Sequence, residues 1–184
     1  MKPSLPKSVN LITSIFSAKE GLIDEVMERL VLNFGALDFK SALLDFVQTD
    51  YYESELGPCL KRRIISFSDL IEIERLIEIK LFTNSMEQDY LSDAKRQTNI
   101  DPGYLSLERV VLATCKDFAH RIYLGKGVYA DLTLVYRGKD FRPLEWTYPD
   151  YASDELRHIL REIRSLYSQK RAGNVQLHDR LRQG

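Results

Sequence analysis

Two kinds of short apolar pattern follow one another along the chain, and their order constrains the fold more than any other feature. Residues Val9 to Phe16 form a short run rich in β-branched side chains, as in a buried strand. Residues 20–34 instead repeat apolar side chains every three or four positions, as in an amphipathic helix, and Gly35 provides a stop. A strand followed at once by a helix predicts a mixed fold.

The same two patterns predict the remaining elements. Short β-rich runs predict strands over residues 38–47, 61–67, 110–116, 121–124, 128–136 and 141–146. The runs 121–124 and 128–136 read as a hairpin, and Pro143 favours an edge strand for the last run. Helical spacing predicts one helix over residues 70–91, capped by Ser68 or Asp69, and another that opens at residues 153–155. Adjacent proline and glycine predict a turn over residues 99–104.

The first six elements are ordered strand, helix, strand, strand, helix, strand. This order predicts an α+β fold with a ferredoxin-like split βαβ core (βαββαβ), extended by a β-hairpin or edge strand and a C-terminal helix. A length of 184 residues suits one domain, which we expect over residues 9–169. Residues 1–8 are expected to be a flexible lead-in, and residues 170–184, with four Lys or Arg and one Asp, a disordered basic tail.

Charge and cysteine content narrow the class of protein. Because 26 Lys and Arg face 27 Asp and Glu, the net charge of −1 gives no global attraction to nucleic acid or to an anionic bilayer. The apolar N-terminal stretch is too short and too polar for a membrane span or a good signal peptide. Cys59 and Cys115 fit no zinc pattern, so we expect reduced, buried thiols in a cytoplasmic protein.

The stretch from Lys116 to Gly127 is the strongest candidate for a binding site. Lys116, Arg121 and Lys126 lie close to a glycine turn whose backbone amides can help to hold an anion. These residues therefore predict a phosphate or carboxylate site, to which Arg62 on the strand 61–67 can contribute.

His120 lies within the same stretch and is open to two interpretations. It can act as a general acid or base near neutral pH, with Asp117 or Asp50 holding its tautomer. The alternative is a packed histidine that bonds to the backbone. Asp50 and Glu53, on a tyrosine-containing loop, are weak candidates for a hard-cation site, since their spacing matches no EF-hand.

Three aromatic residues surround a proline turn at Trp146–Tyr151. Tyr148 and its neighbours can stack a base or a sugar, and core packing or a lid over the last helix is the alternative. The chain has no P-loop, no Rossmann fingerprint and no zinc motif, so the cofactor is unknown.

Five segments together resemble a known family. They are TDYYESELG at residues 49–57, LKRRIISF at 60–67, NIDPGY at 99–104, KDFAHRIYLGKGVYADLTL at 116–134 and WTYPDY at 146–151. Their order resembles the bacterial and archaeal family known as domain of unknown function 4416, over about residues 9–167. The resemblance implies no established activity. Some members carry a GTP-binding label, and this chain has neither the P-loop nor an N-K-x-D motif.

Three hypotheses about function follow. The first is a cytoplasmic module that binds a small phosphorylated or carboxylated ligand through Arg62, Lys116, Arg121, Lys126 and Tyr148. The second is a metal-assisted hydrolase or phosphoryl-transfer enzyme that uses His120 and Asp117. The third is an interaction protein for RNA or another protein, although the balanced charge argues against nucleic acid as the main partner.

Overall fold

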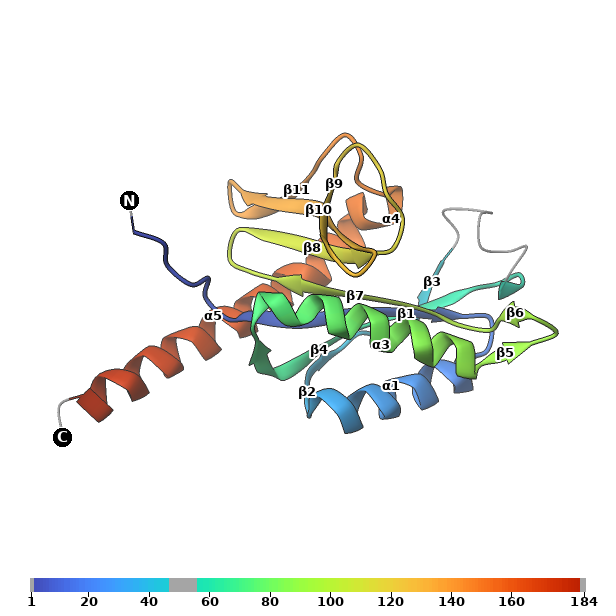
Figure 1. The fold of residues 1–184 in the computed structure, drawn as a ribbon, viewed down its shortest axis with the longest axis horizontal. Coiled ribbons are helices and arrows are strands. Elements are labelled where there is room, and N and C mark those ends of the chain that lie inside the picture. Colours follow the sequence, from blue (N-terminus) through green and yellow to red (C-terminus); the bar gives the residue numbers. More distant parts are fainter. Residues whose placement is uncertain (1, 47–55, 183–184) are drawn as a thin grey trace.

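The computed structural model describes residues 2–46 and 56–182, with side chains as far as residue 173. The described residues form a mixed α+β fold around a sheet of nine strands (Figure 1), which confirms the predicted class. The strands are β1 (Val9–Ser17), β2 (Leu37–Lys40), β3 (Leu44–Asp45), β4 (Lys61–Ile71), β7 (Asn99–Leu105), β8 (Arg109–Thr114), β9 (Arg121–Gly125), β10 (Val128–Arg137) and β11 (Asp140–Pro143). The helices are α1 (Glu20–Phe34), α3 (Leu76–Asp89), α4 (Pro149–Ala152) and α5 (Asp154–Arg182).

Smaller elements connect these parts. A single 3₁₀ turn, η1 (Ile73–Arg75), precedes α3, and a two-stranded ribbon, β5 (Leu91–Ser92) with β6 (Lys95–Arg96), follows it. The main sheet runs in the order β11-β10-β8-β7-β1-β4-β2, while β3 also pairs with β4 and β9 with β10. Neighbouring strands pair antiparallel. β1 lies between β4 and β7, near the middle of the sheet.

β1 is the central strand because its sequence has apolar side chains on both faces. All nine of its residues are buried. Leu11 and Ile15 point toward one face of the sheet, where they join the cluster formed with α1 and α3. Ile12 points the other way and joins the cluster formed with α5. A strand with this two-sided pattern needs a packed layer on each face of the sheet, and here helices provide both layers.

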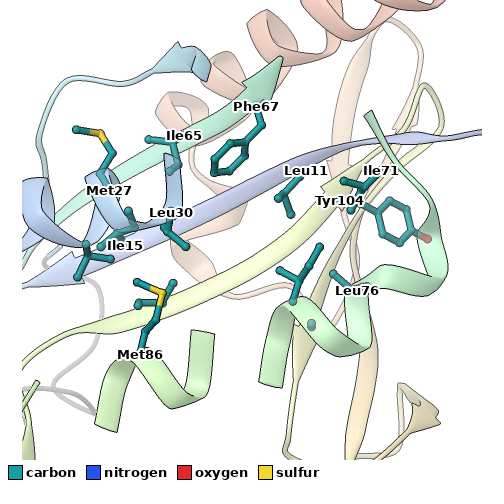
Figure 2. Packing of buried hydrophobic residues seen from close by; sticks show 14 of the residues in the cluster. Leu11, Ile15, Met27, Leu30, Ile65, Phe67, Ile71, Leu76, Met86 and Tyr104 are labelled. Carbon is teal, nitrogen blue, oxygen red and sulfur yellow. The ribbon is translucent and has the colours of Figure 1, made fainter. Parts of the chain in front are cut away.

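The first helical layer consists of α1 and α3, whose apolar stripes pack on one face of the sheet. Figure 2 shows side chains from both helices meeting those of β1, β4 and β7; they include Leu11, Ile15, Met27, Leu30, Ile65, Phe67, Leu76, Met86 and Tyr104. Each large side chain buried in this way contributes about 1.5–3 kcal/mol relative to an exposed one. α1 ends where predicted, because Gly35 takes a φ of 92° and its N–H bonds to the Val31 carbonyl.

The second helical layer is α5, on the opposite face of the sheet. The spacing of apolar residues predicts Leu156, Ile159, Leu160, Ile163 and Leu166 on the inner face of this helix. The first four are buried against Leu134 and Phe141, among others, whereas Leu166 is only half-buried. The buried residue of the next turn is Tyr167, whose hydroxyl donates to the Ser8 carbonyl.

α5 continues as helix to Arg182, and its last turns extend beyond the sheet (Figure 1). The side chain of Lys170 bonds to Asn10, to Asp38 and to the Phe67 carbonyl, so this part of α5 is tied to three strands. The division of the chain into lead-in, domain and tail remains a prediction.

Several sequence predictions were wrong in detail. Residues 99–104 form most of β7 rather than a turn, because pairing with β1 and β8 on either side holds them extended. Leu70 and Ile71 belong to β4 rather than to the next helix, since they pair with Asn10 and Val9. The expected strand over 38–47 is two short strands, β2 and β3, within its described part.

The hairpin and the edge strand were predicted correctly. β9 and β10 pair antiparallel across the Gly125–Gly127 turn, and β11, which contains Pro143, ends the sheet. The state of the cysteines was predicted in part: Cys59 and Cys115 are free thiols, but both are exposed rather than buried.

Candidate functional site

A cleft of about 750 Å³ opens at one end of the sheet. Its walls come from six segments that are far apart in the sequence: Phe16; Phe46; Arg62; Asp101; and the stretches around residues 112–121 and 146–151. β1 and β8 end at this edge of the sheet, while β4, β7 and β10 begin there, because the strands are antiparallel. α4 lies at the same end (Figure 1). The topology therefore gathers polar residues from strand ends and loops into one hollow.

Arg62, the second residue of β4, forms the buried floor of this cleft. Its side chain is 5% exposed, and its guanidinium pairs with Asp150 of α4 at 2.5 Å. The rings of Phe16, Phe46 and Tyr151 surround the same guanidinium, with centroids 4.4–5.5 Å from its central carbon. Burial raises the pKa of the Tyr151 hydroxyl, so that ring stays neutral. Arg62 thus fastens α4 to the sheet and has its charge balanced within the protein.

Arg121, the first residue of β9, is held in one position by three contacts. Its Nε donates to Asp131 of β10 at 2.9 Å, one terminal nitrogen donates to the Lys116 carbonyl, and the other donates to the Tyr148 hydroxyl at 3.0 Å. Burial acts to lower the pKa of Arg121, but the bonds to Asp131 and Tyr148 outweigh it and raise that pKa. The guanidinium therefore remains charged in a partly desolvated wall of the cleft.

His120 shares the same carboxylate. Its Nε2 lies 3.3 Å from Asp131 Oδ2, and its side chain is 12% exposed. Its ring stacks on Trp146 with centroids 5.1 Å apart and an interplanar angle of 11°, and it also contacts Phe118 at 5.3 Å. The histidine therefore packs against aromatic rings and pairs with a carboxylate, rather than bonding to backbone as the alternative interpretation expected.

Asp131 is the functional candidate that sequence reasoning missed. It lies within the largely apolar strand β10 and is 5% exposed. A carboxylate buried in this way needs a partner that compensates its charge. A single acidic residue between strand-forming side chains is the signal that could have found it. The sequence predicted Asp117 or Asp50 as the carboxylate beside His120. The structure places Asp131 there, while Asp50 lies outside the described residues and stays a prediction.

A second, smaller compartment of about 160 Å³ adjoins the cleft. The two share Asp101, Leu112, Lys116, Arg121 and Tyr148 as a common wall. Behind this wall, Glu87 of α3 is 4% exposed; it accepts a bond from the Ile100 N–H at 2.6 Å and pairs with Arg96 at 2.9 Å.

The charged side chains of Glu87 and Lys80 are both paired within this compartment. Burial raises the pKa of the Glu87 carboxyl, against the opposing attraction of Lys80. Lys80 in turn bonds to the Ile100 carbonyl and to Asp101. This compartment is thus a bonded polar network that gives the common wall a rigid support.

A comparison with models of protein families gives the identity of the chain. Residues 7–167 match the family described as Domain of unknown function (DUF4416). The chain belongs to this family. No curated protein and no solved structure matches the chain.

Most of the predicted ligand-binding residues of this DUF4416 chain lie in the cleft. Its lining contains the predicted residues Arg62, Lys116, Asp117, His120, Arg121 and Tyr148. Lys126 lies elsewhere, at the hairpin tip, where its side chain is 63% exposed and pairs with Glu78 at 2.5 Å. Asp50 and Glu53 lie outside the described residues. Among the described residues, the cleft therefore joins four of the five segments on which the resemblance to this family rests.

Neither a cluster of metal-ligating side chains nor a helix able to cross a bilayer occurs in the described residues of this DUF4416 chain. Within residues 2–46 and 56–173, no three His, Cys, Asp or Glu side chains gather closely enough to hold a metal ion. In the part of the chain that the structure describes, no helix has both the length and the apolar character needed to cross a bilayer.

Proposed function

We propose that the cleft binds a small organic anion that carries a phosphate or carboxylate group. The observation that carries this proposal is the position of Arg121 on the common wall of the two compartments. A guanidinium has five N–H donors. Its three contacts use one donor each, which leaves one N–H on each terminal nitrogen. Two such donors in one plane suit two oxygens of a phosphate or carboxylate.

Neighbouring groups support anion binding at the same place. The Tyr148 hydroxyl accepts its bond from Arg121, so its own O–H is able to donate to a ligand. Lys116 lines both compartments and adds positive charge. Asp131 and Tyr148 already hold the Arg121 side chain in place, so this side chain would lose little conformational entropy when a ligand binds.

A thermal-shift screen of the full chain tests this function. The probes are inorganic phosphate, phenyl phosphate, cyclohexyl phosphate and benzoate at millimolar concentration. A ligand at ten times its Kd stabilises the folded state by about 1.4 kcal/mol, which raises Tm by roughly 3–6 °C for a chain of this size. If none of the four anions raises Tm, the proposal is wrong.

An arginine-to-lysine pair supplies the matched control. Arg121→Lys keeps a positive charge beside Asp131 and removes the planar pair of donors. We expect it to weaken anion binding at least tenfold. Arg142→Lys makes the same change on an exposed residue of β11, outside both compartments, and should bind as the unchanged chain does. Equal affinities for the two variants would contradict the role of Arg121.

A second candidate function is acid–base catalysis by His120. The observation in its favour is the His120–Asp131 pair facing the cleft, because a carboxylate on one ring nitrogen orients the other for proton transfer. In the hydrolysis of 4-nitrophenyl phosphate, water would attack phosphorus and the bond from phosphorus to the phenolate oxygen would break. His120 would donate a proton to the leaving phenolate and regain one from the attacking water. We expect His120→Gln to abolish turnover while inorganic phosphate, which carries no ring, still binds at Arg121; absence of turnover by the unchanged chain would reject this candidate.

We also propose that the fold contains a ferredoxin-like core and that the protein is cytoplasmic. The order β7-β1-β4-β2, with α1 and α3 on one face, supports a ferredoxin-like core, because that split βαβ arrangement has its fourth, first, third and second strands in this order. The two free thiols support a reducing, cytoplasmic location.

A further inference from the structure

The aromatic residues of the cleft divide into two groups with different surroundings. Six of the fifteen lining residues are Phe, Trp or Tyr, whereas these types make up 10% of the whole chain. Phe16, Phe46 and Tyr151 surround the Arg62 guanidinium and are at most 8% exposed. Their structural role is therefore accounted for within the protein.

The other three aromatic residues are open to the cleft. Phe118 is 64% exposed, Tyr148 48% and Trp146 38%. Exposed aromatic rings that line a hollow are costly in water, so their presence together points to a ligand that covers them. Trp146 and Phe118 both contact the ring of His120, so the three rings form one continuous aromatic surface. We call Phe118, His120 and Trp146 together the aromatic shelf.

The aromatic shelf has a defined orientation. The indole N–H of Trp146 donates to the Leu132 carbonyl at 2.9 Å, and the adjoining Thr147 hydroxyl donates to the Thr133 carbonyl at 2.6 Å. On its other side, His120 is held by Asp131. Because two bonds to β10 fix the loop and a third contact fixes the histidine, Trp146 and His120 are ordered before any ligand arrives.

The shelf and the anion-binding arginine are neighbours. His120 and Arg121 are consecutive, and both contact Asp131 Oδ2. Tyr148, two residues after Trp146, bonds to Arg121. A ligand whose charged group lies on Arg121 would thus have its body beside the shelf.

We infer that the ligand of this cleft is an organic anion built on a planar unsaturated ring, with the ring stacked on the aromatic shelf and the anionic group on Arg121. This inference rests on the proposed function and adds to it the class of ligand. Planar rings gain from stacking on aromatic faces, whereas a saturated ring of similar size offers no π-face.

Phenyl phosphate and cyclohexyl phosphate test this inference, because they carry the same anionic group on a planar and on a puckered ring. Trp146 is the single tryptophan of the chain, so its fluorescence reports directly on the shelf. We expect phenyl phosphate to quench this fluorescence and to bind about tenfold more tightly than cyclohexyl phosphate.

Two substitutions locate the effect. Phe118→Leu keeps the tryptophan signal and should reduce the preference for the planar ring to less than threefold. Tyr123→Leu removes an equally exposed aromatic ring from β9 outside the cleft and should leave the preference intact. Equal affinity for the two phosphates would overturn the planar-ring inference while anion binding stood. Binding of neither would overturn the inference too, and if inorganic phosphate and benzoate also failed to bind, the proposed function would be wrong as well.

Discussion

The buried ion pair between Arg62 and Asp150 gives a sharp test of how the cleft is held together. The side chains are 5% and 12% exposed, and their charged atoms lie 2.5 Å apart. Arg62→Met keeps an unbranched apolar chain among the surrounding rings and leaves Asp150 as a buried charge without its partner. We expect the free energy of unfolding to fall by about 3–5 kcal/mol. At 2–4 °C per kcal/mol, Tm should fall by roughly 6–20 °C.

Substitution of the other partner, Asp150, should also lower the free energy of unfolding. Asp150→Asn leaves the guanidinium buried without its counter-charge, and its Nε already has no hydrogen-bond partner among the described residues. The double variant removes both charges at once. The double variant should lose much less free energy of unfolding than the two single variants lose together, with a coupling energy of about 3 kcal/mol or more.

Urea unfolding of the four proteins measures this cycle. Trp146 fluorescence follows the cleft, and far-ultraviolet circular dichroism follows the whole fold, so coincident transitions identify global unfolding. Two strictly additive losses would refute the reasoning, because additivity means that neither charge depends on the other. Single losses below about 1 kcal/mol would refute it equally, since they are the size expected of an exposed pair.

Three further substitutions test other parts of the fold. Gly103→Ala would place a Cβ atom 2.4 Å from the Val111 carbonyl oxygen, so we expect urea unfolding to show a loss of about 2 kcal/mol or more; unchanged stability would contradict this close strand approach. Burial acts to raise the pKa of the Asp140 carboxyl, but two arginines of α5 outweigh it and lower that pKa. Because the resulting stability is lost as pH falls through the lowered pKa, Asp140→Asn should lower Tm at neutral pH and much less in strong acid, and an equal fall at both would contradict this. Lys170→Met should lower the free energy of unfolding by about 1–3 kcal/mol in thermal melts, because Asp38 loses its charged partner; no change would show that this part of α5 is dispensable.

The sequence predicted well those elements in which the spacing of apolar side chains indicates which face is buried. In α1, apolar residues at spacings of three and four face the sheet, and Ile23, Val26, Met27 and Leu30 are indeed buried. The glycines around Lys126 likewise predicted a tight turn, and both take positive φ there. Such features depend on neighbours only a few positions away, so local sequence suffices.

The errors occurred where distant pairing overrode local preference. Pro102 and Gly103 are turn formers, yet they lie in β7, where Pro102 is opposite Thr13 and Gly103 is opposite Leu112. The missing Cβ of Gly103 serves a close approach between strands rather than a turn. A residue window around NIDPGY contains no information about either partner strand, because both are supplied by other parts of the chain.

The cleft shows the same division between local and distant information. The sequence by itself determined the types of group available: arginine and histidine beside a glycine turn, and aromatic residues around a proline. Only the tertiary structure decided which of them meet. The antiparallel sheet brings Arg121 to Tyr148 and buries Asp131 beneath both His120 and Arg121, while Lys126, only five positions away, lies at the hairpin tip. Charge and shape become a site only when the ends of several strands meet, and strand pairing is a property of the whole chain.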